Sequence, residues 1–150
     1  MTPSRFLITA ILLAGADQAH ALCSVELAPV TFGAVDTREN NRGTGEVVVR
    51  CDQATGFEVA ISGGGAGGTR RMDGPEGGRL DYRLFADAAR AVPWGDGGSV
   101  GNAVAAASDG TGQRRLTIYG EIPPQSGVLA GEYVASVQVT LSFGPAQVPA

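Results

Sequence analysis

The segment from Gly131 to Phe143 alternates between two kinds of side chain over its whole length. One side of the alternation is apolar and the other is mostly polar, the apolar side being Tyr133, Ala135, Val137, Val139, Leu141 and Phe143. Because successive side chains of a β-strand point to opposite faces, this pattern predicts one long strand with its apolar side on a core. Residues 144–150 follow with two prolines among them, so we expect no further strand. The free edge of this strand then needs a partner, which we expect to be another polypeptide.

The first residues have the pattern of a secretory signal. Arg5 precedes an apolar run at positions 6–16, and Ala19, His20 and Ala21 fit a cleavage site. The run is too short for a membrane span, which needs about 20 apolar residues. We therefore expect a signal peptide at residues 1–21, one exported domain at residues 22–150, and no membrane span.

The charge and composition exclude several classes of function. The chain has 11 Lys and Arg residues against 15 Asp and Glu, a net charge of −4, which argues against nucleic acid as a partner. The single histidine, His20, would leave with the signal, and the chain has no lysine. The exported part then has no histidine base, no imidazole metal ligand and no phosphate-loop lysine. Carboxylates remain, and a glycosidase would need two of them flanking a cleft, but most of the best-spaced ones lie beside Gly, where Asp usually makes turns. We therefore expect no catalytic residues, no metal and no cofactor, and not an enzyme.

Two cysteines in an exported chain are expected to form one disulfide, Cys23–Cys51, with free thiols as the alternative. The remaining apolar runs are short and separated by Gly, Asp, Asn and Pro, which predicts an all-β sandwich. The expected strands are Cys23–Leu27, Val30–Gly33, Glu46–Cys51, Phe57–Ser62, Leu80–Phe85, Arg115–Ile122 and Gly131–Phe143.

A Gly-rich loop carries the only tryptophan, Trp94, followed two residues later by Asp96. An aromatic ring beside a carboxylate can bind a sugar, so these two residues are candidates for a ligand loop. The alternative is a structural turn in which Trp94 packs over one end of the sandwich.

In this order, the segments resemble the spore coat protein U domain family, which includes the pilins of archaic chaperone–usher pili. The resemblance covers residues 23–143, and one departure is Ala135, where the family commonly has Asp. The matching pieces are Cys23-Ser24-Val25, Val30-Thr31-Phe32-Gly33, the strand ending at Cys51, Arg71-Met72, Leu80-Asp81-Tyr82-Arg83-Leu84-Phe85, Trp94-Gly95-Asp96-Gly97, Tyr119-Gly120-Glu121-Ile122-Pro123 and Gly131-Glu132-Tyr133.

The resemblance implies an immunoglobulin-like sandwich that lacks its final strand. Its groove is expected to accept a strand from a periplasmic chaperone, and later one from another pilin subunit. An outer-membrane usher would be a further partner, and the protein would reach a surface fibre or the extracellular medium through the periplasm. The residues expected to form this acceptor groove are Tyr133, Val137, Val139, Leu141 and Phe143.

The predicted function is a structural or adhesive subunit of a surface pilus. Leu22 alone separates the expected cleavage site from Cys23, which leaves no donor segment, so we expect a terminal (tip) subunit. The alternatives are a secreted coat-type protein of the same fold and a carbohydrate-binding module that uses the Trp94 loop to bind surface glycans.

Overall fold

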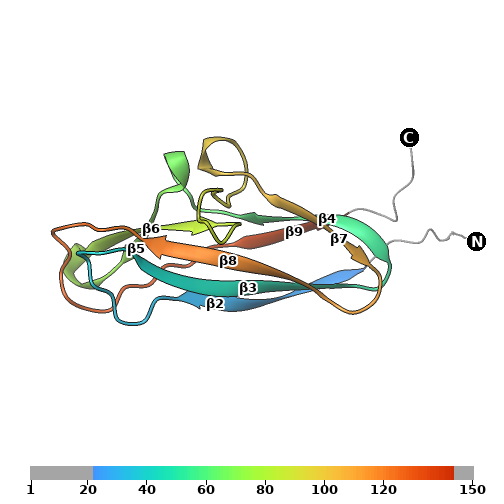
Figure 1. Cartoon of the computed structure of the whole chain (residues 1–150), viewed down its shortest axis with the longest axis horizontal. Coiled ribbons are helices and arrows are strands. Elements are labelled where there is room, and N and C mark those ends of the chain that lie inside the picture. The colour runs from blue at the N-terminus through green and yellow to red at the C-terminus, as the bar shows by residue number, and fades with distance from the viewer. Residues whose placement is uncertain (1–21, 144–150) are drawn as a thin grey trace, which may run out of the picture.

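Two antiparallel sheets face each other in the computed structural model, which describes residues 22–143. The expected signal peptide lies outside the described residues. The larger sheet has the order β2 (Cys23–Thr31), β3 (Asn41–Cys51), β8 (Arg114–Ile122), β6 (Arg79–Phe85) and β5 (Arg70–Asp73). The smaller sheet has the order β7 (Val104–Asp109), β4 (Ala54–Ile61) and β9 (Val139–Phe143). The predicted all-β sandwich is confirmed, and the sheets lie one over the other along the length of the molecule (Figure 1).

The core lies between the sheets and follows the period-two pattern of the sequence. Alternate residues of β4 are buried, with Phe57, Val59 and Ile61 at most 4% exposed. Val47 and Val49 of β3 are fully buried and face the core from the larger sheet. Alternation places these residues inside because each strand has one face on the core and one toward solvent.

Several strand boundaries differ from the prediction. The two segments expected at Cys23–Leu27 and Val30–Gly33 are one strand, β2, whose register shifts between Ala28 and Thr31. Strands β5 and β7 were not predicted. Strand β5 has only four residues, and β7 is rich in alanine, which has a low strand propensity.

The disulfide between Cys23 and Cys51 is confirmed. The two residues are direct cross-strand partners in the β2–β3 ladder. The bond therefore ties β2, which lies at the end of the larger sheet, to its neighbour β3.

Tyr133 forms a local feature typical of immunoglobulin-like sandwiches. Its hydroxyl donates a hydrogen bond to the carbonyl oxygen of Leu129 at 2.6 Å. Such a bond, from a tyrosine before a late strand to the backbone just upstream, is the tyrosine corner of that fold. The ring lies against the β5–β6 turn, where a Cβ atom on Gly74 would clash with Cε2 of Tyr133.

Glycines of β3 and β8 make room for the residues at the end of β2. A Cβ atom on Gly120 would lie 2.7 Å from Phe32 Cζ and 2.8 Å from Val30 Cγ1. A Cβ atom on Gly45 would lie 2.6 Å from the carbonyl oxygen of Ala28. Residues 28–32 therefore lie so close to the backbone of β3 and β8 that a side chain larger than that of glycine would collide with them.

Replacing Gly120 by Ala is expected to destabilise the protein by about 1–3 kcal/mol, because overpacking displaces Phe32 and Val30. Urea unfolding followed by circular dichroism measures this change. Gly56→Ala is the control, since the nearest heavy atom to its new Cβ is 3.9 Å away. Equal stability of the two variants would show that the close approach at Gly120 is wrong.

Candidate functional site

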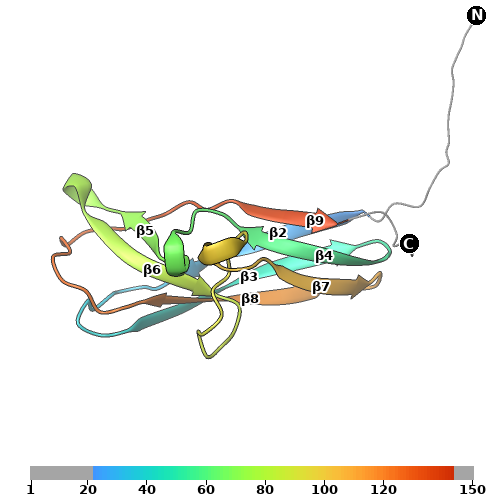
Figure 2. The same ribbon diagram turned by 90° about the horizontal axis from the view of Figure 1, so that it is seen from above.

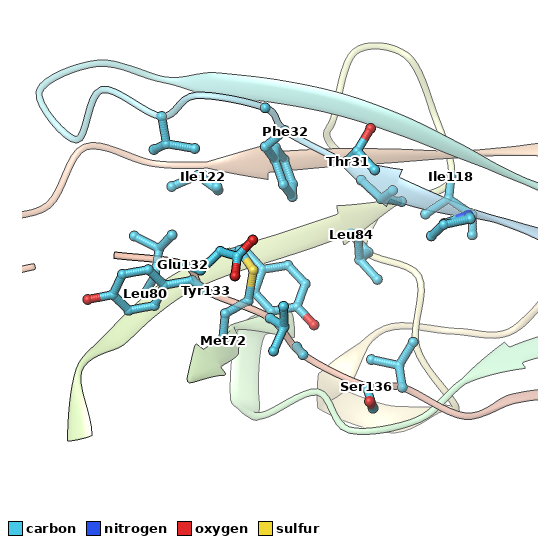
Figure 3. Close-up of a pocket in the computed structure, with 18 of the residues that line it drawn as sticks. Thr31, Phe32, Met72, Leu80, Leu84, Ile118, Ile122, Glu132, Tyr133 and Ser136 are labelled. Carbon is cyan, nitrogen blue, oxygen red and sulfur yellow. The ribbon is translucent and has the colours of Figure 1, made fainter. Parts of the chain in front are cut away.

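An apolar cavity of about 1060 Å³ opens between β2 and the C-terminal part of the chain. One wall is formed by residues 27–35 and the other by residues 128–137 and Val139. Figure 3 shows the floor, where side chains of the core point into the cavity. The floor residues are Ile61, Met72, Leu80, Tyr82, Leu84, Ile118 and Ile122. We call this cavity, with its two walls and its floor, the groove.

One wall of the groove includes the end strand of the larger sheet, and the other leads into the end strand of the smaller sheet. Strand β2 ends the larger sheet and β9 ends the smaller one. Among the described residues, β2 pairs with β3 alone and β9 pairs with β4 alone. Figure 2 shows β2 and β9 along the same side of the sandwich. Each wall therefore presents an edge whose backbone N–H and C=O groups have no strand beside them.

Apolar residues on the core side of β2 remain exposed. Val25 is the cross-strand partner of Val49, and Leu27 is the partner of Val47. Directly opposed residues lie on the same face of a sheet, yet Val47 and Val49 are 0% exposed while Val25 is 36% and Leu27 is 53% exposed. The core side of β2 thus lacks the layer that would cover it.

The opposite wall departs from the predicted strand. Residues 131–138 are hydrogen-bonded on one side at two places. The amide of Asp73 donates to the carbonyl oxygen of Val134 at 2.9 Å, and the amide of Ser62 donates to that of Gln138 at 2.9 Å. The prediction of a continuous strand is wrong here, because the paired side is interrupted: β4 ends at Ile61 and β5 begins only at Arg70.

The phase of the terminal strand is confirmed. Val139 and Leu141 are half-buried and pack against the core, whereas Thr140 between them is exposed. Of the residues predicted to form the groove, Tyr133, Val137 and Val139 line it. Leu141 and Phe143 lie further along β9, where they are the cross-strand partners of Val59 and Phe57.

Sequence reasoning missed the β2 wall and most of the floor. The alternation of Val25 and Leu27 was visible, but nothing in it indicated that their core side would lack a cover. The floor residues other than Met72 lie in segments predicted as strands, and they belong to the core that the groove reaches from the side.

Tyr82, in the floor, is 6% exposed. Burial raises the pKa of its phenol, while the charge of Arg70 opposes that shift. The phenol is therefore neutral in the ordinary pH range and adds no charge to the groove.

The structure separates the two residues of the predicted ligand loop. Trp94 is 1% exposed and its indole N–H donates to the carbonyl oxygen of Val59 at 2.8 Å, whereas Asp96 is exposed. Both faces of the indole are therefore covered, and no aromatic platform for a sugar is presented. This position fits the structural role that was the alternative.

Arg70 holds the Trp94 loop to the end of β4. One terminal nitrogen, Nη2, donates to the carbonyl oxygens of Ile61 at 3.1 Å and Trp94 at 3.0 Å, and the other, Nη1, donates to that of Ser62. Burial lowers the pKa of this guanidinium. The cluster around Arg70 and Trp94 is a structural clamp.

No group of three or more His, Cys, Asp or Glu side chains within residues 22–143 is placed to hold a metal ion. None of the helical turns in that part of the chain has the length and apolar character of a membrane span.

The fold and the groove define an immunoglobulin-like sandwich with one side left open. The family model of the Spore Coat Protein U domain matches residues 8–140, and the chain belongs to that family. No curated protein shows significant sequence similarity to it.

Two solved structures are similar in fold. One is from the CsuC–CsuE chaperone–tip adhesion subunit pre-assembly complex of the archaic chaperone–usher Csu pili of Acinetobacter baumannii, with 18% identity and a TM-score of 0.54 over 91% of this chain. The second is a chaperone–tip adhesin complex of CFA/I fimbriae biogenesis, with 12% identity and a TM-score of 0.46 over 81% of this chain. The chain spans 40% of the length of the first and 42% of the second.

Proposed function

We propose that this protein is a subunit of a chaperone–usher type surface pilus, and that its groove accepts a β-strand from another polypeptide. The observation that carries the proposal is the pair of open sheet edges on either side of exposed apolar residues, Leu27 on one wall and Val137 on the other. Family membership and the fold of the Csu neighbour support the assignment to this class of pilus.

One added strand would pair with both open edges of the groove and would cover its exposed apolar side chains. Its backbone would bond to β2 on one side and to residues 131–143 on the other, and its alternate side chains would enter the apolar cavity. Each apolar side chain that is fully buried contributes about 1.5–3 kcal/mol, from which the cost of ordering the strand is subtracted. A chaperone would supply this strand in the periplasm, and a neighbouring subunit would supply it in the fibre.

The test uses a peptide of about ten residues with Val or Ile at every second position. We expect the peptide to raise the melting temperature of the isolated exported chain. A peptide of the same composition without alternation is expected to have no effect.

Leu27→Asp shows whether the peptide binds in the groove. Leu27 is 53% exposed in the free protein, so this change is expected to leave the free protein folded but to abolish stabilisation by the peptide. Val92→Asp is the matched control, because Val92 is also 53% exposed but does not line the groove. The proposal fails if the free chain is heat-resistant and monomeric and does not respond to the peptide.

Position at the tip of the fibre stays a sequence-based prediction. Sequencing of the mature N-terminus tests it, because a start well before Ala21 would leave a segment ahead of β2 that could be donated.

A further inference from the structure

The groove is uncharged along both walls except at one residue. Among the described residues that line it, Glu132 alone carries a formal charge. Figure 3 shows the side chain of Glu132 among apolar residues of the groove. Its neighbours on the same wall, Leu129 and Val134, are 47% and 69% exposed. The groove therefore has one acidic position among mostly apolar side chains.

The carboxylate of Glu132 has no partner within residues 22–143. The salt bridges there engage four other acids, Asp36, Glu121, Asp81 and Glu46. None of the side-chain hydrogen bonds within residues 22–143, which near this residue include those of Tyr133 and Gln138, is accepted by the Glu132 carboxylate, and Glu132 is exposed. Water solvates it in the free protein, and a strand that fills the groove would displace part of that water. Removing water from an unpaired charge is unfavourable, whereas a basic side chain nearby would offset the cost.

We propose that the strand accepted by the groove carries a lysine or arginine beside Glu132. Through this pair, Glu132 selects the partner strand and fixes its register. The proposal rests on the function proposed above. A slip of the strand by one residue turns its apolar side chains away from the core. A slip by two residues keeps the apolar phase but moves each side chain by about 6.6 Å, and a charge at a fixed position discriminates against it.

The experiment uses the alternating Val peptide with one Lys placed in turn at each outward position, and a matched set with Glu. Binding to the purified exported chain is measured by isothermal titration calorimetry at low and high salt. At one position we expect the Lys peptide to bind about three- to fivefold more tightly than the Glu peptide, the size expected for an exposed ion pair. High salt is expected to reduce this preference.

The variants identify the residue responsible. Glu132→Gln is expected to remove the preference and Glu132→Lys to reverse it, both without a change in melting temperature because the residue is exposed. Glu58→Gln is the control, since Glu58 is an exposed residue of β4 outside the groove. That variant is expected to keep the preference of the natural chain.

Two outcomes would overturn the inference and leave the proposed function standing. In the first, Lys and Glu peptides bind the natural chain equally at every position. In the second, the Glu132→Gln variant keeps the preference; self-association of that variant would then show that the charge repels other copies at an open edge. Failure of every peptide to bind any variant would overturn both proposals.

Discussion

A chain with Asp in place of Val47 is expected not to fold. Val47 is 0% exposed and sits in β3 between Leu27 of β2 and Leu116 of β8. No basic side chain is a cross-strand partner there, so the new carboxylate would be buried without a counter-charge at a cost of several kcal/mol. The free energy of unfolding of a small domain is about 5–15 kcal/mol, and this sandwich leaves part of its core uncovered. Far-UV circular dichroism and sensitivity to protease report the loss.

The matched control is Val48→Asp, one residue further along the same strand. Val48 is half-buried on the opposite face, and its cross-strand partners are Glu26 and Arg115. Glu26 would repel the new carboxylate and Arg115 would attract it, and solvent reaches this face of the sheet, so we expect a loss of about 1 kcal/mol or less. Equal damage at the two positions would mean that the phase of β3 is wrong.

Local alternation predicts the strands that have a neighbour on each side. Phe57, Val59 and Ile61 alternate in the sequence and are buried in β4, which lies between β7 and β9. The same holds for Ile118 and Ile122 of β8, which lies between β3 and β6. In these strands the alternation of side chains predicts the strand correctly, because this chain itself supplies the hydrogen-bonded neighbour on both edges.

The prediction fails where the partner of a strand is not fixed by the residues of the strand itself. Residues 131–138 have the alternation of a strand but make only isolated backbone contacts with Ser62 and Asp73. Their pattern indicates which side faces the core, and Val139 and Leu141 confirm that phase. The alternation carries no information on which segment lies along the free edge. That neighbour is determined by the tertiary structure and by any added strand.

The candidate site was predicted on one wall only for a similar reason. Tyr133, Val137 and Val139 were identified from alternation and do line the groove. Leu27 has the same alternation, but its exposure depends on what lies opposite, which the sequence does not specify. For Trp94 the sequence suggested a binding site where there is none. Tryptophan is common in binding sites, but here the indole N–H donates a hydrogen bond to the carbonyl oxygen of Val59 in the core.

Replacing both cysteines by alanine is expected to lower the free energy of unfolding by about 3–4 kcal/mol and to detach β2. The bond joins residues 28 positions apart, and in the chain-entropy model closing such a loop stabilises the fold by this amount. Most β2 residues are exposed, so little apolar burial holds the strand. Besides the ladder with β3, two hydrogen bonds hold the start of β2 next to the disulfide. The amide of Asp52 donates to the carbonyl oxygen of Leu22 at 2.9 Å, and the amide of Leu22 donates to Asp52 Oδ1 at 2.8 Å.

Hydrogen exchange distinguishes detachment of β2 from general loss of stability. Amides of β2 are expected to lose protection at low denaturant while those of β8, in the middle of the sheet, stay protected. Without β2 the groove has one wall, so the alternating peptide should no longer bind to the variant. Protected β2 amides and peptide binding of normal strength would show that the ladder with β3 alone holds this wall, and that the disulfide acts on the unfolded chain without shaping the groove.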